Sequence, residues 1–368
     1  MRSNFCGKIS VDQLDQDVQL CGWVMRRRDH GGVIFLDVRD IKGICQAVVN
    51  PDNEKSFKLA ESIRNEYVVQ INGDVRKRLE GTINKNMHTG EIEIDVKDLV
   101  ILSKASTPVF PIDEYQEVNE DVRLKNRVLD LRRPEMNERI ITRSKITSLV
   151  RNYLDKNDFH EIETPILTKA TPEGARDYIL PSRVQPGSFY ALPQSPQLFK
   201  QLLMIGGLDK YYQIARCFRD EDLRADRQPE FTQIDIEASF LNQDEIMSIS
   251  EMMIKDIIKE FCGDNLEKFE VINWHDAMRD YGCDKPDLRI PLKLVDISDL
   301  VKDEEFKVFS EPAQKQGSRV VALKVPNGNW LSRGQIDDYT KFVSKLGAKG
   351  LAYIKINDAM DLENGIQS

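Results

Sequence analysis

The sequence predicts an α+β protein of several domains that begins with an OB-fold β-barrel. The chain has 368 residues, 40% of them hydrophobic, which is too long for one ordinary domain and too apolar for a disordered chain. Apolar and polar residues alternate through much of the first hundred positions, as they do in half-buried strands. Two later segments instead repeat apolar residues every three or four positions, the spacing of amphipathic helices.

The N-terminal hundred residues give the order of elements on which the barrel prediction depends. Phe57, Ala60 and Ile63 recur at a spacing of three and indicate a short helix between the third and fourth strands. Three strands, a helix and two strands is the order of an OB barrel, whose open face commonly binds oligonucleotides. An SH3-like barrel or half of a sandwich would also be compatible with this pattern. The expected strands are 18–24, 33–38, 44–49, 67–75 and 91–96.

Residues 103–125 are expected to be a linker, because they are weakly periodic, contain Pro108 and Pro111, and are acidic. A long helix is predicted over about 136–157, followed by a strand-like run at 159–167 that Pro165 interrupts. A second helix is predicted over 243–261. The apolar stripe expected to be buried on the first helix is Ile146, Leu149, Val150, Tyr153 and Leu154. The second helix carries Ile246, Ile249, Met253 and Ile257 on one face.

Beyond about residue 285 the texture changes, and strand-like runs at 319–325 and 350–356 alternate with a charged helical stretch at 333–346. This alternation favours a further α/β module. The domains expected from the sequence are therefore 1–105 for the barrel, 106–130 for a hinge, 131–284 for a second domain and 285–368 for part of a third.

Charge and cysteine content exclude several classes of protein. The formal net charge is −9, and residues 1–105 are neutral with 16 basic and 16 acidic side chains, so bulk positive charge is not what binds a nucleic acid. The sequence has no run of 18 apolar residues, which is the length needed to span a membrane, and the N-terminus has no signal-peptide pattern. The six cysteines lack CxxC spacing, so we interpret them as reduced thiols of a cytoplasmic protein.

The densest group of charged residues lies at 217–237, between expected strands at 211–218 and 231–240. A solvated loop of mutually neutralising charges is the ordinary explanation of such a run. The functional alternative is that arginines grip a polyphosphate through bidentate hydrogen bonds while carboxylates bind Mg²⁺ or a ribose. The chain has no P-loop and no GxGxxG motif, so a nucleotide would have to be held in this other way.

The charged hairpin resembles motif 2 of class II aminoacyl-tRNA synthetases, through Phe218, Arg219, Asp220 and Glu221 followed by Arg227 and Phe231. Residues 159–167 with Pro165 resemble motif 1, the dimer-forming segment of that class. Finer matches are to bacterial-type aspartyl-tRNA synthetases, and the resemblance as a whole covers essentially all of the chain. These finer matches are residues 129–134 (LDLRRP), 170–178 (ATPEGARDY) and 192–200 (LPQSPQLFK).

This resemblance implies an anticodon-binding OB fold, an incomplete class II catalytic domain on an antiparallel sheet, and part of an inserted α/β domain. It implies an ATP-dependent aspartate–tRNA ligase that forms aspartyl-adenylate, with Arg219 and Glu221 as catalytic residues. Mg²⁺ would accompany ATP, with most of its ligands outside these residues and no metal site among them. The residues implied for ATP are Arg219, Asp220, Glu221 and Gln228, and those for L-aspartate are Glu173, Ser195, Gln197, Lys200, Arg219 and Asp235.

For the barrel the resemblance implies recognition of the tRNA anticodon. Phe35 would stack on a base, Arg28, Gln46 and Glu93 would read base edges, and Arg76 and Arg78 would support the backbone. His30 and Gly81 resemble the relaxed form of the family, which charges tRNA(Asn) as well as tRNA(Asp). The motif 1 resemblance implies a homodimer in which Pro165 lies at the interface.

The sequence departs from the family pattern at its C-terminal end. It has no GxGxxDR-like motif 3 and lacks the later arginine and paired histidines of the aspartate pocket. We therefore expect a truncated chain with little activation activity of its own. A non-catalytic tRNA-binding protein is the alternative from another class, and asparaginyl- or lysyl-tRNA synthetase is an alternative within the class.

Overall fold

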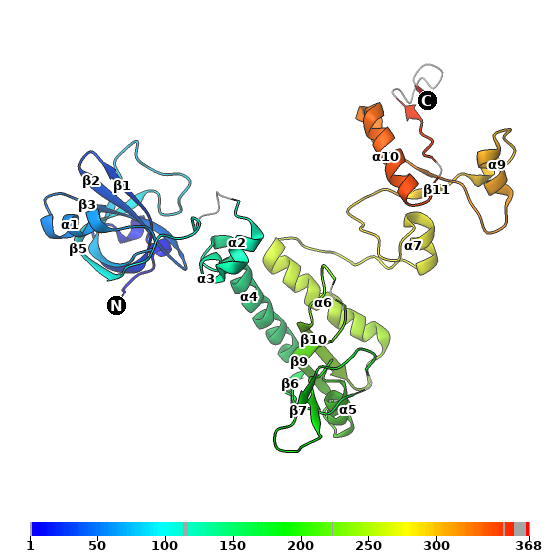
Figure 1. The fold of residues 1–368 in the computed structure, drawn as a ribbon, viewed down its shortest axis with the longest axis horizontal. Helices are drawn as coiled ribbons and strands as arrows, with labels where there is room; N and C mark the ends of the chain where they lie inside the picture. Colours follow the sequence, from blue (N-terminus) through cyan, green and yellow to red (C-terminus); the bar gives the residue numbers. More distant parts are fainter. Residues whose placement is uncertain are drawn as a thin grey trace. The chain divides into compact units, whose positions relative to one another are not determined.

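The computed structural model describes residues 2–112, 117–171, 173–222, 224–348, 350–356 and 366–367. Contacts divide the chain into two compact units, Met1–Asn265 and Leu266–Ser368 (Figure 1). The second unit begins before residue 285, where the sequence placed a domain start, and so includes helix α7 (Trp274–Tyr281). Part of the expected acidic linker, residues 113–116, lies outside the described residues.

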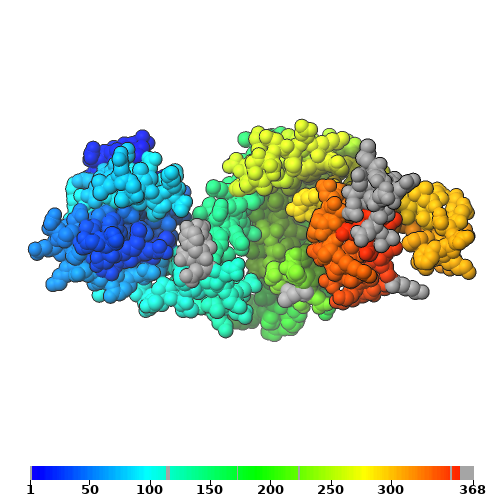
Figure 2. Space-filling view, turned by 90° about the horizontal axis from the view of Figure 1, so that it is seen from above, coloured from blue at the N-terminus to red at the C-terminus, as the bar shows by residue number. Residues whose placement is uncertain are grey.

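The N-terminal domain is a closed five-stranded barrel, as the sequence predicted, with strand order β1-β2-β3-β5-β4 and β4 paired back onto β1. All neighbouring strands are antiparallel except β3 and β5, which run parallel. In the space-filling view the barrel, blue to cyan, is a compact body (Figure 2). Its elements are two 3₁₀ turns (Cys6–Lys8, Val11–Gln13), β1 (Asp17–His30), β2 (Val33–Asp40), β3 (Gly43–Val49), α1 (Glu54–Ser62), β4 (Val68–Lys77) and β5 (Ile92–Ser103).

The alternation seen in the sequence becomes the inside and outside of the barrel wall. Leu20, Leu36 and Ile71 are at most 1% exposed, and each such side chain contributes about 1.5–3 kcal/mol by its burial. Strand β5 carries a bulge at Lys97, because the consecutive residues Asn72 and Gly73 of β4 pair with Asp98 and Val96. A Cβ added to Gly73 would lie 2.1 Å from the carbonyl oxygen of Asp95. Only glycine allows this close approach of β4 to β5.

The expected hinge is partly helical. It contains α2 (Glu120–Lys125) and α3 (Arg127–Asp130). Asp130 ends α3 and is fully buried, where it forms ion pairs with Arg123 and Arg127. Ion pairs between residues close in sequence therefore stabilise the helical part of the hinge.

A cluster of three charges joins the barrel to the segment that follows α3. The buried Glu66 carboxylate accepts two hydrogen bonds of 3.0 Å from Arg39 and one of 3.0 Å from Arg132. Arg132 also lies over the ring of Trp23, with its guanidinium carbon 5.3 Å from the ring centroid. The LDLRRP run thus packs against the barrel through a buried ion pair and a cation–π contact.

The second domain is built on a three-stranded sheet of order β10-β9-β6. Strands β9 (Lys210–Phe218) and β10 (Glu230–Ala238) form the predicted antiparallel hairpin, and β6 (His160–Glu161) runs parallel to β9. The strand expected over 159–167 was too long, because pairing ends after Ile162 and Pro165 has no N–H to donate. The associated helices are α4 (Pro134–Lys156), α5 (Gln197–Ile205) and α6 (Gln243–Cys262), and a small hairpin is formed by β7 (Ile179–Pro181) and β8 (Phe189–Ala191).

The two faces of the β9–β10 hairpin have different neighbours. One face carries Tyr212, Ile214 and Ile236, which pack against α4 and α6 in an apolar cluster. Val150 and Leu154 of the predicted stripe on α4 are fully buried there. On α6, Ile249, Met253 and Ile257 join this cluster, whereas Ile246, near the start of the helix, is 38% exposed. The other face carries the polar residues described below.

The second unit contains short elements joined by long connections. The predicted helix at 333–346 is α10 (Arg333–Lys345), and only the central part of 319–325 and the end of 350–356 form strands. Within the described residues, no helix has the length and apolar character needed to cross a lipid bilayer. The remaining elements are β11 (Leu294–Asp296), α8 (Ser298–Val301), α9 (Lys307–Gln314), β12 (Val321–Leu323), a 3₁₀ turn (Gly328–Trp330), β13 (Lys355–Ile356) and β14 (Ile366–Gln367).

Candidate functional site

Lys200 is the buried cation of the second domain. It lies in the first turn of α5, and only 8% of the residue is exposed. Its ammonium nitrogen is 2.9 Å from Oδ1 of Asp235 and 3.3 Å from Oε2 of Glu237, both on β10. These two ion pairs hold the Lys200 ammonium in one place, between two carboxylates.

The pKa values of this pair reflect burial and mutual charge. Burial alone would lower the pKa of Lys200, but the hydrogen bond and charge of Asp235, together with Glu237, hold it above its ordinary value. Burial raises the pKa of Asp235, and Lys200 offsets only part of that effect. The second oxygen of Asp235, Oδ2, is buried and accepts no hydrogen bond that meets normal geometry among the described residues.

Arg219 follows β9 and is fixed through its backbone, because its N–H donates to the carbonyl oxygen of Pro229 at 2.9 Å. Its guanidinium lies over the ring of Phe231, 5.0 Å from the centroid. The Nε of Arg219 is buried and has no acceptor in the part of the chain that the structure describes. A buried donor of this kind is suited to an anionic ligand.

The thiol of Cys217 shows that the predicted charges gather on one face of the hairpin. Burial, together with the charges of Asp235 and Glu173, raises the pKa of Cys217 to about 11, and the charges of Arg219 and Lys200 oppose this rise. The thiol itself donates to Oε1 of Gln233 at 3.1 Å. In the register of the hairpin Cys217 pairs with Phe231, and side chains alternate along a strand, so Phe231, Asp235 and Glu237 lie on the face of Cys217. Arg219, which stacks over Phe231, lies on that face too.

Glu173 reaches the same region from a loop. Its Oε2 accepts a hydrogen bond of 2.7 Å from the hydroxyl of Ser195, and its Oε1 accepts one of 3.1 Å from Thr171. The backbone N–H of Asp220 donates to the carbonyl oxygen of Arg176 at 3.0 Å, which links this loop to the hairpin. The structure therefore joins the loop of the ATPEGARDY run to the motif 2 hairpin, although the two are distant in sequence.

Three predicted residues are less closely tied to this group. Glu221 and Gln228 are exposed in the loop between β9 and β10, and Gln197 is half-buried in the first turn of α5. Among the described residues, no hydrogen bond or ion pair joins any of them to the Lys200 site. Pro165 is exposed, as are its neighbours Ile166 and Leu167.

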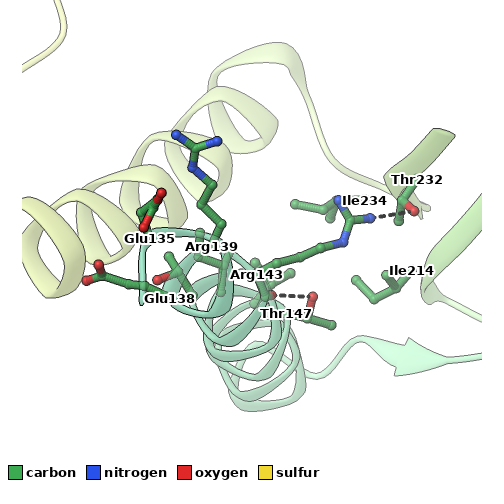
Figure 3. Close-up of a pocket in the computed structure, with 11 residues that line it drawn as sticks. Glu135, Glu138, Arg139, Arg143, Thr147, Ile214, Thr232 and Ile234 are labelled. Carbon is green, nitrogen blue, oxygen red and sulfur yellow. Dashed lines mark hydrogen bonds between the residues drawn. The ribbon is translucent and has the colours of Figure 1, made fainter. Parts of the chain in front are cut away.

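A separate cavity lies on the opposite face of the hairpin. It has a volume of 610 Å³ and is lined by α4 and by Ile214, Thr232 and Ile234 of the sheet (Figure 3). Arg143 of α4 reaches across it and donates to the hydroxyl of Thr232 at 2.8 Å. Even-numbered residues of β10 face this cavity, whereas Asp235 and Glu237 face Lys200.

The barrel carries a second polar cluster, formed by residues that the sequence singled out. Arg28 donates to Oε1 of Gln46 at 3.0 Å, and Gln46 donates to Oε2 of Glu93 at 3.0 Å. Arg76 donates to the other oxygen of Glu93 at 2.9 Å. Asp37 completes one end of the chain of bonds through a 2.8 Å contact with Arg28. These five side chains, all but Asp37 singled out from the sequence, form a continuous network on the wall of the barrel.

Phe35 lies beside this network and outside the apolar core. Its ring is half-buried, with the guanidinium carbon of Arg28 5.9 Å from its centroid. Arg78 is buried and donates to the carbonyl oxygen of Ile92 at 2.9 Å. His30 is exposed at the end of β1, and Gly81 is exposed in a turn. Gly81 has a φ of +85°, which favours glycine.

Sequence reasoning missed two buried polar residues of the site. Gln194 is 2% exposed and contacts the Glu173 loop, and Tyr211 is fully buried and donates to Gln213 at 2.8 Å. A polar residue between Pro193 and Ser195 in the LPQSPQLFK run was the available signal for Gln194. Across the described ranges, no group of three or more His, Cys, Asp or Glu side chains has the arrangement of a metal site.

Comparisons with known proteins agree with this geometry. A family model described as tRNA synthetases class II (D, K and N) matches residues 119–349, and one described as an OB-fold nucleic acid binding domain matches residues 18–102. The chain resembles the asparaginyl-tRNA synthetase from Pyrococcus horikoshii complexed with asparaginyl-adenylate, with 27% identity and a TM-score of 0.62 over 77% of this chain and 63% of that one.

Two further solved structures are similar. Another structure of asparaginyl-tRNA synthetase from Pyrococcus horikoshii has 25% identity and a TM-score of 0.59, over 77% of this chain and 62% of that one. A putative aspartyl-tRNA synthetase from Leishmania major Friedlin shares the fold, at 22% identity and a TM-score of 0.63, over 74% of this chain and 57% of that one. The chain spans less than two thirds of each of these structures.

The first family model covers well over half of the chain, and its matched region contains both α4 and the β9–β10 hairpin with their paired charges. The chain belongs to the class II tRNA synthetases of the D, K and N group, with an OB-fold nucleic acid binding domain at its N-terminus.

Proposed function

We propose that this chain serves an aspartate–tRNA ligase, which activates L-aspartate with ATP and transfers it to the 3′ end of tRNA. The observation that carries the proposal is that the buried Lys200 ammonium, paired with Asp235 and Glu237, and Arg219, stacked over Phe231, lie on the same face of the hairpin. One group suits an acidic amino acid and the other suits a phosphate. A chain that only binds tRNA would have no use for this pair.

The chemistry proceeds in two steps. A carboxylate oxygen of aspartate attacks the α-phosphorus of ATP, and the bond to pyrophosphate breaks. The 3′-hydroxyl of the tRNA then attacks the carbonyl carbon of the adenylate, and AMP leaves. Arg219 is placed to stabilise the charge that develops on the α-phosphate, with Asp220, Glu221 and Gln228 proposed to contact the rest of the nucleotide. These groups position and stabilise without a covalent enzyme intermediate.

Lys200 is the proposed determinant of the amino acid. An ammonium has three donor hydrogens, and the contacts with Asp235 and Glu237 account for two of them. The third is available for the side-chain carboxylate of aspartate. Glu173, Ser195 and Gln197 are proposed to contact the ammonium and main carboxylate of the substrate. Asparagine offers a neutral amide oxygen instead, which forms a weaker hydrogen bond with a cation.

The test is equilibrium binding of two non-hydrolysable analogues, the sulfamoyl analogues of aspartyl- and asparaginyl-adenylate, by calorimetry. We expect the aspartyl analogue to bind at least about a hundredfold more tightly, because a site organised around a charge discriminates strongly. Binding does not require turnover, so the result is independent of the rate of activation. Equal or tighter binding of the asparaginyl analogue would assign the chain to asparagine instead.

The barrel is proposed to bind the anticodon of tRNA(Asp), with Phe35 as the stacking platform. Phe35→Ala should weaken binding of an anticodon stem-loop by about 1–3 kcal/mol, because base stacking on an aromatic ring is lost. Phe35→Tyr keeps the ring and serves as the matched control. The two affinities can be compared by fluorescence anisotropy. An unchanged affinity for Phe35→Ala would remove Phe35 from the interface.

His30 and Gly81 motivate an extension of the proposal, in which the ligase charges tRNA(Asn) as well as tRNA(Asp). Both residues are exposed at or beside turns, where a bulkier, apolar side chain would leave less room for an anticodon base. Binding of the two anticodon stem-loops should then differ by less than about tenfold. A difference above about a hundredfold would contradict the extension.

A homodimer is also part of the proposal, with Pro165 at its interface. Pro165 is exposed between the end of β6 and two exposed apolar residues, Ile166 at 43% and Leu167 at 58%. Three consecutive exposed apolar residues are suited to a protein–protein contact.

A further inference from the structure

Gln194 uses nearly all of its hydrogen-bonding capacity on a single loop. Its Oε1 accepts from the N–H of Ala175 at 3.0 Å, and its Nε2 donates to the carbonyl oxygen of Ala175 at 2.9 Å. The same Nε2 also donates to Oδ1 of Asp177. The paired bonds to one residue imitate the pairing between two strands, and a side-chain amide can make only four hydrogen bonds in all.

The loop that Gln194 holds is residues 173–177, which we call the Glu173 loop. It lies just before β7 and contains Gly174, whose φ of +97° only glycine adopts readily. Gly174 and Arg176 are exposed, so the loop has little apolar packing of its own. Its middle, Ala175, is held on both its N–H and its carbonyl oxygen by the amide of Gln194, while the N–H of Asp220 holds the carbonyl oxygen of Arg176.

Gln194 itself is rigidly placed. It is 2% exposed, and its neighbours Pro193 and Pro196 are buried on either side. The carbonyl oxygen of Pro193 accepts a hydrogen bond of 2.9 Å from the N–H of Phe218 at the end of β9. Pro193 has a restricted φ, and Pro196 restricts the backbone of Ser195 before it, so the chain is constrained on both sides of Gln194. The amide of Gln194 thus extends from a fixed point on the sheet.

We propose that Gln194 is a positioning residue of the amino-acid site, which clasps the Glu173 loop so that the Glu173 carboxylate stays beside Ser195. This inference rests on the proposed function, in which Glu173 contacts the substrate ammonium. The segment that holds the loop leads directly into α5 and Lys200. One short segment therefore fixes the groups at both ends of the amino acid, which sets their separation.

Hydrogen exchange measured by mass spectrometry tests the clasp without any ligand. In Gln194→Ala, exchange in the loop should become about tenfold faster, because the N–H of Ala175 loses its acceptor. Exchange in α4 and β9 should stay unchanged, which shows that the domain remains folded. Gln201→Ala, an exposed glutamine on α5, is the matched control and should leave the loop unchanged. Unchanged loop exchange in Gln194→Ala would overturn the proposal.

A second variant tests the contact with Asp177. Gln194→Glu keeps an acceptor for Ala175 but places a carboxylate against that of Asp177, so it should loosen the loop at pH 7. Adding Asp177→Asn should slow exchange again, because the asparagine amide can donate to the new glutamate. Failure of the double variant to differ from Gln194→Glu would also count against the clasp.

Binding of the aspartyl-adenylate analogue tests the positioning role. Its affinity should fall about tenfold in Gln194→Ala and be unchanged in Gln201→Ala. A faster-exchanging loop with unchanged affinity would overturn the positioning role. Absence of binding by the unaltered chain would instead overturn the proposed function, and the exchange data, which need no ligand, keep the two failures distinguishable.

Discussion

Replacing Lys200 with methionine is expected to weaken binding of the aspartyl-adenylate analogue at least about a hundredfold and to destabilise the domain by about 3–5 kcal/mol. The substitution keeps the length of the side chain but removes the charge that Asp235 and Glu237 face. The carboxylate of Asp235, buried within the site, is then left without its cation. Calorimetry measures the affinity, and urea unfolding measures the stability.

A double variant separates the two effects. Lys200→Met with Asp235→Leu removes the unpaired carboxylate, so most of the stability should return while the analogue still fails to bind. Lys145→Met, on the exposed face of α4, is the control for loss of a lysine. Tight analogue binding by either Lys200 variant would contradict the assigned role of Lys200.

The same pair gives a pH dependence with a defined sign. The pKa of Lys200 is raised in the folded protein above its ordinary value of 10.5. Its contribution to stability is therefore complete below about pH 10.5 and is lost as the pH rises through the higher folded value. Unfolding measured across this alkaline range should show a loss of stability that is absent from the Lys200→Met protein.

The second large effect is expected at Glu66, where replacement by alanine should destabilise the barrel by about 3–5 kcal/mol. Arg39 is 8% exposed and would lose both of its bonds to the carboxylate. Arg132 would lose its link to the barrel as well. Urea unfolding followed by the fluorescence of Trp23, which Arg132 covers, reports on both changes.

Two controls define this result. Adding Arg39→Met to Glu66→Ala should restore much of the lost stability, because no unpaired charge is then buried. Asp98→Ala, which breaks an exposed ion pair with Lys55, should change the stability by less than about 1 kcal/mol. A loss of similar size in both single variants would mean that burial of the Glu66 charge is unimportant.

The barrel could be predicted from the sequence because its strands have one buried face, and the pattern fails only where that condition fails. Alternation stops near Lys97 and Asp98, yet β5 continues to Ser103, since Leu99 is buried while Val100 is 39% exposed. In the second domain, the run at 159–167 is strand-like in sequence, but only two of its residues form a strand. Apolar content alone does not reveal where a neighbouring strand ends.

The site was only partly predictable, for a physical reason. The resemblance singled out Lys200 and Asp235 through local motifs, and these residues do pair. The role of Gln194 depends instead on Ala175, which is 19 positions earlier and offers only backbone atoms. Backbone partners leave no mark in a sequence, so contacts of this kind can be found only once the chain is folded.

The two-sided construction of β10 restricts how its gene segment can change length. The side chains of residues 231–237 point alternately to the Lys200 side of the sheet and to the apolar cluster, in an unbroken register with β9. Insertion of one codon here would turn Asp235 toward the helices and bring an isoleucine in front of the lysine. Length variation among relatives should therefore accumulate in the exposed connection at 220–228, and a deletion within the strand would remove chemistry and folding together.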